Sequence, residues 1–210
     1  MEVSKPLLRG HSHQAMFFIA LGACTILFTQ CQNWEERFSI IAYSLSTLAL
    51  FGISALYHRV NWKVKTKAVM RRLDHSAIYI SMVGTGTPIC LLAMDSEAGL
   101  KLWVMLSIIS TLGVLKSICF SNIPNFVRAS LYVIAGSMSI LFIRELISGL
   151  GATSFILLLG GGISYIAGAI IYGLKWPKLN PNIFGYHEVF HVFVNIGALC
   201  HFLVIYNLIF

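Results

Sequence analysis

The sequence predicts an all-α integral membrane protein, a bundle of seven transmembrane helices with a cytoplasmic N-terminus and an external C-terminus. Of the 210 residues, 57% are hydrophobic and only 11% are charged, whereas a soluble domain has about a quarter charged residues. A helix that crosses a bilayer needs roughly 20 mainly apolar residues. Seven stretches are long and apolar enough: 14–31, 38–58, 75–94, 100–119, 126–146, 152–174 and 186–209.

The basic residues between these stretches predict the orientation. With the N-terminus in the cytoplasm, twelve of the 15 Lys and Arg residues lie on the inner side, as the positive-inside rule requires. Membrane orientation therefore explains the net charge of +7, and we expect no nucleic-acid partner. The exceptions are Arg37, Lys101 and Arg144; the inner residues are Lys5, Arg9, Arg59, Lys63, Lys65, Lys67, Arg71, Arg72, Lys116, Arg128, Lys175 and Lys178.

The expected organisation is a cytoplasmic tail, residues 1–13, followed by one transmembrane domain, residues 14–210. Leu21-Gly22-Ala23-Cys24 is similar to a lipoprotein cleavage box, but the apolar run continues to Phe28, so we interpret this segment as the first span. The cysteines have no CxxC spacing and are expected to be buried apolar residues. They are Cys24, Cys31, Cys90, Cys119 and Cys200.

Two later spans carry packing signals. Thr85-Gly86-Thr87-Pro88 in the third span predicts a kink in which neighbouring hydroxyls meet the freed backbone groups. The sixth span is rich in glycine, which predicts close approach to a neighbouring helix. Its glycines are Gly160, Gly161, Gly162, Gly168 and Gly173.

Polar residues gather at the predicted inner ends of three spans. Ionisable groups inside a membrane are costly and therefore indicate function. Because all three span ends lie at the same depth, we expect their side chains to converge near the cytoplasmic face. They are Ser54 and His58 in the second span, Asp74 and His75 in the third, and His187 and His191 in the seventh.

The three histidines His58, His187 and His191 predict a zinc site. His187 and His191 are one turn apart on the same helical face, and His58 supplies the third imidazole. Three histidines with an open fourth position form a catalytic zinc arrangement, in which the metal lowers the pKa of a bound water to near 7.

The adjacent carboxylate and hydroxyl have predicted roles in proton chemistry. Asp74 and His75 point roughly 100° apart around a helix, and we assign Asp74 as the general base or the partner of the metal-bound water. Ser54 would orient a water, Asp74 or a substrate carbonyl. An Asp at a helix start is also often an N-cap, which leaves a capping role for Asp74 open.

The segment His187-Glu188-Val189-Phe190-His191 also matches the HExxH pattern of zinc proteases. Metzincins place a further histidine where this chain has Gly197, and no acidic residue follows Glu188. The pattern therefore lacks its third ligand, although Glu188 stays an alternative general base. We expect His11 and His13 to be solvated in the tail, and His201 to be a buried, hydrogen-bonded residue.

At these residues the sequence resembles the hemolysin III family, the bacterial branch of the progestin and adipoQ receptor superfamily. The resemblance implies a seven-helix bundle with Zn²⁺ held by the three histidines, and a multi-pass protein of the bacterial inner (plasma) membrane. Asp74 and Ser54 match the aspartate and serine of the family motif. The matching segments are Ser54-Ala55-Leu56-Tyr57-His58, Arg72-Leu73-Asp74-His75-Ser76-Ala77-Ile78-Tyr79 and Gly185-Tyr186-His187-Glu188-Val189-Phe190-His191.

The resemblance also implies membrane lipids as partners. The site architecture is similar to that of alkaline ceramidases, so the expected activity is metal-dependent hydrolysis of lipid amide or ester bonds. Two alternatives stay open, in both of which zinc is structural. One is a pore-forming cytolysin (haemolysin), and the other is a receptor-like sensor with a lipid or fatty acid as its ligand.

Overall fold

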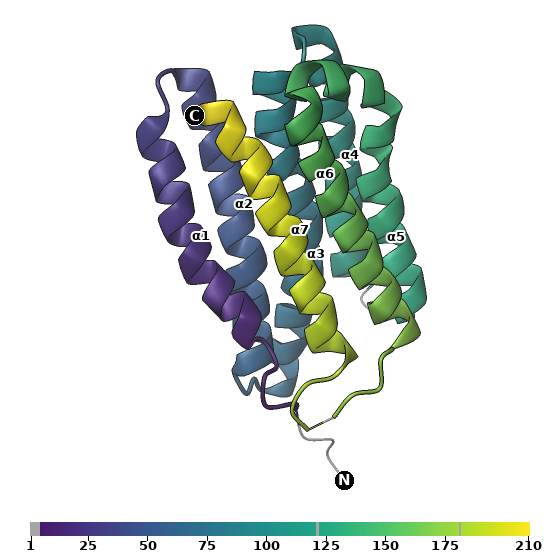
Figure 1. Ribbon diagram of the computed structural model, residues 1–210. Helices are drawn as coiled ribbons and strands as arrows, with labels where there is room; N and C mark the ends of the chain where they lie inside the picture. The colour runs from purple at the N-terminus through teal and green to yellow at the C-terminus, as the bar shows by residue number, and fades with distance from the viewer. Residues whose placement is uncertain (1–4, 121, 181) are drawn as a thin grey trace.

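All regular structure that the computed structural model describes is helical; it describes residues 5–120, 122–180 and 182–210. Figure 1 shows the helices as long rods side by side. Six helical runs in this part of the chain are long and apolar enough to cross a membrane. In chain order the elements are α1 (His11–Gln30), α2 (Trp34–Arg59), α3 (Val64–Pro88), the π-helix η1 (Ile89–Ala93), α4 (Ser96–Cys119), α5 (Asn125–Ser137), the 3₁₀-helix η2 (Met138–Phe142), α6 (Ile143–Leu174) and α7 (Tyr186–Ile209).

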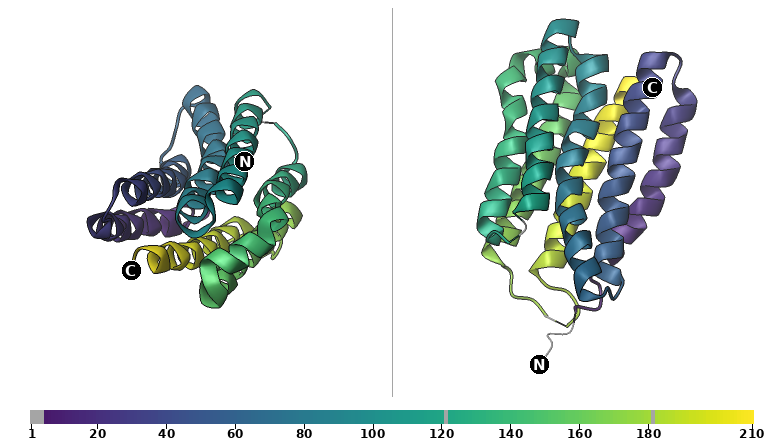
Figure 2. Two further views of the ribbon diagram at one scale, coloured as in Figure 1. Left: turned by 90° about the horizontal axis from the view of Figure 1, so that it is seen from above. Right: turned by 180° about the vertical axis from the view of Figure 1, so that it is seen from behind.

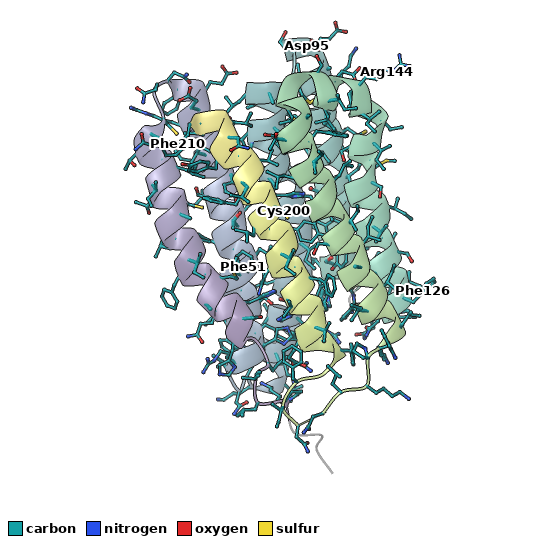
Figure 3. The ribbon with its side chains drawn as sticks, viewed as in Figure 1. Phe51, Asp95, Phe126, Arg144, Cys200 and Phe210 are labelled. Atoms are coloured by element: carbon teal, nitrogen blue, oxygen red, sulfur yellow. The ribbon has the colours of Figure 1, made fainter. Side chains whose placement is uncertain are left out.

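Helix α7 has a central place in the bundle. Figure 2 shows α1 and α2 on one side and α5 and α6 on the other, with α3 and α7 between them. The packing of α7 against both α6 and α1 brings its first turns close to the start of α1 and the end of α2. Phe51 of α2 (Figure 3) is fully buried in an apolar cluster that includes Ala77 and Val194.

Helices α1 to α4 all begin before the apolar stretches that predicted them, and α3 does so by the most. Helix α1 begins at His11 and α3 begins at Val64, ahead of the apolar stretches that predicted them. The first turns of α3 carry four basic residues. Because these turns are not apolar, hydropathy does not identify them, although their backbone is helical. The basic residues are Lys65, Lys67, Arg71 and Arg72. Asp74 therefore lies well inside α3, and the residue at its N-terminal boundary is Lys63. The N-cap interpretation of Asp74 is wrong.

The run from α5 to α6 is continuous in sequence but not in helical geometry. Residues 125–174 pass through η2 and then through Gly151, whose φ of 70° and ψ of 170° are not helical. Positive φ is the region that glycine, with no Cβ, occupies at little cost. The break lies within α6, and the part of α6 that follows it packs against α5, where the Tyr172 hydroxyl accepts a hydrogen bond of 3.0 Å from the Arg128 guanidinium.

The packing signals in the third and sixth spans are partly confirmed. The Thr87 hydroxyl donates to the Val83 carbonyl at 2.7 Å, beside Pro88 where α3 passes into the π-helix. A Cβ on Gly161 would lie 2.4 Å from the His201 ring, so this glycine permits the close approach of α6 and α7. Gly160 and Gly162 meet nothing within 4 Å, and for them the close-approach prediction is wrong.

The cysteines are all free. Cys24, Cys31 and Cys90 are buried as expected, whereas Cys119 is exposed. None of the five lies in the polar cluster described next.

Candidate metal centre

Three histidines from two helices meet at one end of the bundle. His58 lies in the last turn of α2, and His187 and His191 lie in the first two turns of α7. One ligand nitrogen from each lies within 4.8 Å of the other two, and the Nε2 atoms of His58 and His187 are 3.2 Å apart. The four-residue spacing in α7 puts His187 and His191 on one face, and the end of α2 supplies the third ring across the helix contact.

The donor set fits a metal ion. Three nitrogens bound to zinc at about 2.0–2.1 Å with tetrahedral angles lie about 3.3 Å apart, so the observed spacing needs only small side-chain adjustments. His58 and His191 are buried, and the Nδ1 atom of His191 has no hydrogen-bond partner among the described residues. Neutral imidazoles in a buried group are the donors that zinc and related transition metals prefer.

A carboxylate and a hydroxyl adjoin the three rings. The Asp74 Oδ2 atom lies 3.9 Å from His58 Nε2, and the Asp74 side chain is 14% exposed. Ser54, one turn before His58 in α2, is buried, and its side chain lies close enough to the Asp74 carboxylate to interact with it. The carboxylate is therefore held at the edge of the three-histidine cluster (His58, His187 and His191), where it can accept a proton from a molecule bound there.

The neighbouring His75 points elsewhere. It is buried outside the three-histidine cluster, and its backbone carbonyl accepts a hydrogen bond of 3.2 Å from the Tyr132 hydroxyl. Of the two adjacent residues, the structure places Asp74 against the cluster.

Sequence comparison now relates this arrangement to known proteins. The family model described as haemolysin-III related matches residues 1–202. The chain belongs to the haemolysin-III-related family. It is a multi-pass membrane protein of that family, with the six candidate spans described above.

Three relatives show how far the similarity extends. The chain is 32% identical to "Hemolysin-3" of Bacillus cereus over 208 residues, which cover 95% of this chain and 90% of the relative. It is 27% identical to "Hemolysin-3 homolog" of Bacillus subtilis over 203 residues, 95% of this chain and 92% of the relative. The "ADIPOR-like receptor IZH2" of Saccharomyces cerevisiae is 40% identical over 88 residues, which cover 35% of this chain and 27% of the receptor.

In this haemolysin-III-related protein, Glu188 has a structural role. Its Oε1 atom pairs with the Arg9 guanidinium, and its Oε2 atom accepts a hydrogen bond of 2.7 Å from the Gly185 backbone N–H at the start of α7. Both carboxylate oxygens are thus engaged away from the three-histidine cluster, which does not include Glu188. This arrangement favours a helix-capping role for Glu188 over the general base of an HExxH protease.

We expect Glu188→Gln to keep its metal content and to lose about 1–3 kcal/mol of stability, because a buried hydrogen bond to a charged group is lost. The Gln side chain can still accept the Gly185 hydrogen bond. Metal analysis of the purified protein and thermal unfolding in detergent measure the two effects, and Arg9→Gln is the matched variant on the other partner. Loss of a hydrolytic activity with unchanged stability would instead identify Glu188 as a general base.

The prediction that His13 is solvated in the N-terminal tail is wrong. Its side chain is only 3% exposed, and its ring stacks on that of His191 with centroids 3.8 Å apart and an interplanar angle of 7°. His11, at the first position of α1, is exposed as expected. The signal for His13 was present in the sequence, since it precedes an apolar run on the same predicted side as the other histidines.

His201 lies apart from the cluster, as expected. Its Nε2 atom is 3.2 Å from the Leu158 carbonyl oxygen, and its ring contacts that of Tyr165. It serves the contact between α6 and α7.

The segment before α1 is hydrogen-bonded to the chain on both sides of the three-histidine cluster. The backbone N–H groups of Leu7 and Leu8 donate to the carbonyls of Asn182 and Ile183 in the connection before α7, at 2.8 and 3.1 Å. The Lys5 ammonium donates to the Val60 carbonyl at 3.1 Å. Burial and the nearby charges of Lys67 and Arg9 lower the pKa of Lys5 from its ordinary value. This segment, residues 5–10, therefore joins the end of α2 to the start of α7.

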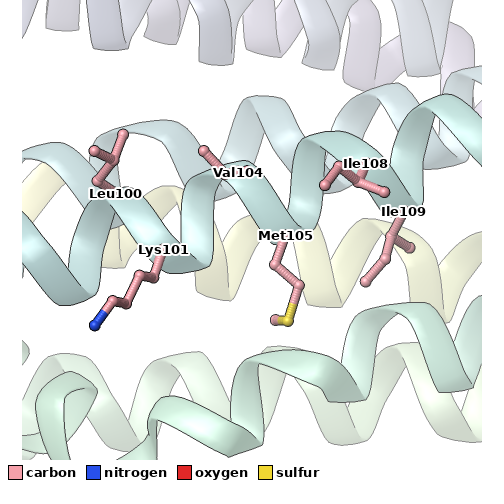
Figure 4. Close-up of a pocket in the computed structure, with 6 residues that line it drawn as sticks. All are labelled: Leu100, Lys101, Val104, Met105, Ile108 and Ile109. Carbon is pink, nitrogen blue, oxygen red and sulfur yellow. The ribbon is translucent and has the colours of Figure 1, made fainter.

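A separate hollow of about 460 Å³ lies along α4 (Figure 4). It is apolar apart from one ammonium group, and it belongs to the half of α4 that begins near Asp95, at the end of the bundle opposite the start of α7 (Figure 3). It carries no group suited to hydrolysis and fits contact with lipid chains. Its lining residues are Leu100, Lys101, Val104, Met105, Ile108 and Ile109.

Proposed function

We propose that this protein is a zinc-dependent hydrolase of lipid amide or ester bonds, with its site near the cytoplasmic face of the bacterial inner membrane. The observation that carries the proposal is the three-histidine cluster with a carboxylate beside it: Asp74 Oδ2 lies 3.9 Å from His58 Nε2. A purely structural metal site is usually closed by four protein ligands, whereas this cluster provides three imidazoles and places a proton acceptor next to them.

The proposal includes seven spans, with the N-terminus cytoplasmic and the C-terminus outside. The run of residues 125–174 is interrupted at Gly151 and folds back on itself, which supports two crossings. The start of α1 and residue Phe210 lie at opposite ends of the bundle (Figure 1), as an odd number of crossings requires. The distribution of basic residues supports the orientation.

The chain's own residues suggest how hydrolysis proceeds. His58, His187 and His191 would hold the ion, and zinc, when bound, supplies a Lewis acid and makes a water nucleophile available near neutral pH. The Asp74 carboxylate accepts the proton of the attacking water at Oδ2 and returns it to the leaving amine or alcohol. Ser54 interacts with that carboxylate and would hold it in place. Residues 5–10, which are hydrogen-bonded to the connection before α7, would limit the access of bulk water to the site.

The substrates that fit this position are membrane lipids. The site lies at the ends of membrane-spanning helices, where the amide or ester bond next to a lipid headgroup is found and where acyl chains can extend along the bundle. A fatty acid would be the product of such a reaction and would bind the same site as a ligand.

The name of the Bacillus cereus relative, "Hemolysin-3", favours a second candidate function, a pore-forming cytolysin. In that case the metal would only tie α2 to α7. The match to an "ADIPOR-like receptor" favours a lipid-sensing role with the same structural use of the metal.

Metal removal and reloading separate these functions. The protein is purified, stripped with a chelator, reloaded with Zn²⁺ and incubated in liposomes with a ceramide or a phospholipid, and the products are measured by mass spectrometry. We expect lipid hydrolysis only after reloading. Failure to retain any metal would contradict the proposal, and metal-independent release of a dye from the same liposomes would support the cytolysin.

A further inference from the structure

His13 adjoins the three-histidine cluster but is not part of it. Besides stacking on His191, its ring meets the edge of Phe51, with centroids 5.2 Å apart and an interplanar angle of 76°. Both ring nitrogens are buried and have no hydrogen-bond partner of normal geometry among the described residues. The backbone of His191 lies close enough to interact electrostatically with the imidazole.

The stacking geometry excludes His13 as a ligand of the same ion as His191. A metal bonds the lone pair of an imidazole nitrogen, which lies in the plane of the ring. The two rings are nearly parallel and 3.8 Å apart, so one ion cannot lie in both planes. His13 therefore acts on the cluster through His191 and not as a fourth ligand in this arrangement.

The start of α1 is fixed tightly enough to give His13 a defined position. Gly10, with a φ of +80°, leaves room where a Cβ would lie 2.8 Å from the Cβ of His58. Arg9 is paired with Glu188 at the start of α7. The helix that carries His13 is thus anchored to both helices that carry the histidine cluster.

A buried imidazole without hydrogen-bond partners is costly, because its ring nitrogens lose their hydration and gain no hydrogen bond in exchange. A phenyl ring would stack on His191 at no such cost. A hydrogen bond between a His13 ring nitrogen and a polar molecule that enters the site would offset the cost of burying a histidine here.

We propose that His13 is a positioning residue of the metal centre. By stacking, it holds the His191 imidazole in the orientation in which that ring binds the metal. It also presents a ring nitrogen to a polar molecule, water or a polar group of a ligand, that enters the site beside the three histidines. This inference rests on the metal binding of the proposed function but does not require turnover. Partners that orient histidine ligands by hydrogen bonds commonly affect metal affinity 10–100-fold, and we expect the stacked ring of His13 to act at the lower end of that range.

The test compares His13→Ala, which removes the ring, with His13→Phe, which keeps the stacked ring and removes the nitrogens. His11→Ala is the matched control, two residues away and exposed. The readouts are Zn²⁺ affinity by competition with a chelator, the visible spectrum of the Co²⁺-loaded protein, and thermal unfolding of the metal-free protein. None of them depends on hydrolysis.

We expect His13→Ala to weaken Zn²⁺ binding by about tenfold or more, and His13→Phe to restore it to within about threefold of wild type because the aromatic contact is kept. His13→Phe should still shift the Co²⁺ spectrum relative to wild type, because the contact between the His13 ring nitrogen and a polar molecule in the site is lost. His11→Ala should match wild type throughout.

The inference is overturned if His13→Ala binds Zn²⁺ as wild type does, or if both His13 variants lose the metal only in step with a less stable metal-free fold. A Co²⁺ spectrum of His13→Phe identical to that of wild type would remove the role of the nitrogens. Wild-type protein that binds no metal overturns the proposed function together with this inference, whereas a normal His13→Ala variant overturns the inference alone.

Discussion

We expect His187→Ala to purify without zinc and to stay metal-free when it is reloaded. The variant leaves two imidazoles from different helices, His58 and His191, and loses the nitrogen that lies 3.2 Å from His58 Nε2. Zinc sites with four ligands bind with about 10–16 kcal/mol, so one ligand contributes roughly 3–4 kcal/mol and its loss weakens binding by a hundredfold or more. Lipid hydrolysis should disappear with the metal.

The control is His201→Ala on the same helix. His201 is hydrogen-bonded to the Leu158 carbonyl and lies outside the cluster, so this variant should retain one zinc per folded chain even if it unfolds at a lower temperature. Elemental analysis of the monodisperse fraction of both proteins is the measurement. Equal zinc content in wild type and His187→Ala would show that the ion binds elsewhere.

The position of the three-histidine cluster could be predicted because span ends at one membrane face must lie at similar depth. The basic residues set the side, the apolar stretches set the depth, and the spacing of His187 and His191 set the helical face. These three signals alone predicted that His58 lies beside the helix of His187, although the two residues are more than 120 positions apart in sequence. In the structure their Nε2 atoms are 3.2 Å apart.

What could not be predicted depends on contacts that leave no periodic signal. Glu188 in HExxH has the position of a protease base. Its pairing with Arg9, 179 residues away in the chain, and its hydrogen bond from the Gly185 N–H show that it is engaged elsewhere. Hydropathy places the start of the third span near residue 75. The first turns of α3 carry lysines and arginines, so they are helical but not apolar, and a search for apolar stretches misses them. That error made Asp74 look like an N-cap.

His13 combines both difficulties. An HxH pair at the start of a chain resembles a solvated tail, and hydropathy placed the first span just after it. The helix in fact begins at His11, and the burial of His13 comes from its packing against α2 and α7 through Phe51 and His191. Depth was the informative signal, because His13 lies at the same predicted level as the other histidines.

The second large effect is expected at Asp74. Asp74→Asn keeps the shape of the side chain and can still interact with Ser54, but an amide cannot take up a proton at neutral pH. General-base catalysis commonly contributes 10²–10⁴-fold, so we expect hydrolysis to fall by about that factor. Zinc content should be unchanged, because the three histidines are untouched.

Ser54→Ala separates the proton acceptor from its support. It leaves the Asp74 carboxylate in place and removes the hydroxyl that interacts with it. A polar interaction of this kind is worth about 1 kcal/mol, so hydrolysis should fall only about fivefold. A strong loss in Asp74→Asn, a mild loss in Ser54→Ala and normal zinc in both would assign the proton transfer to Asp74. If Asp74→Asn instead loses zinc, the carboxylate acts by holding His58, which lies 3.9 Å away. If it retains full activity, the proton acceptor must be sought in another residue near the cluster.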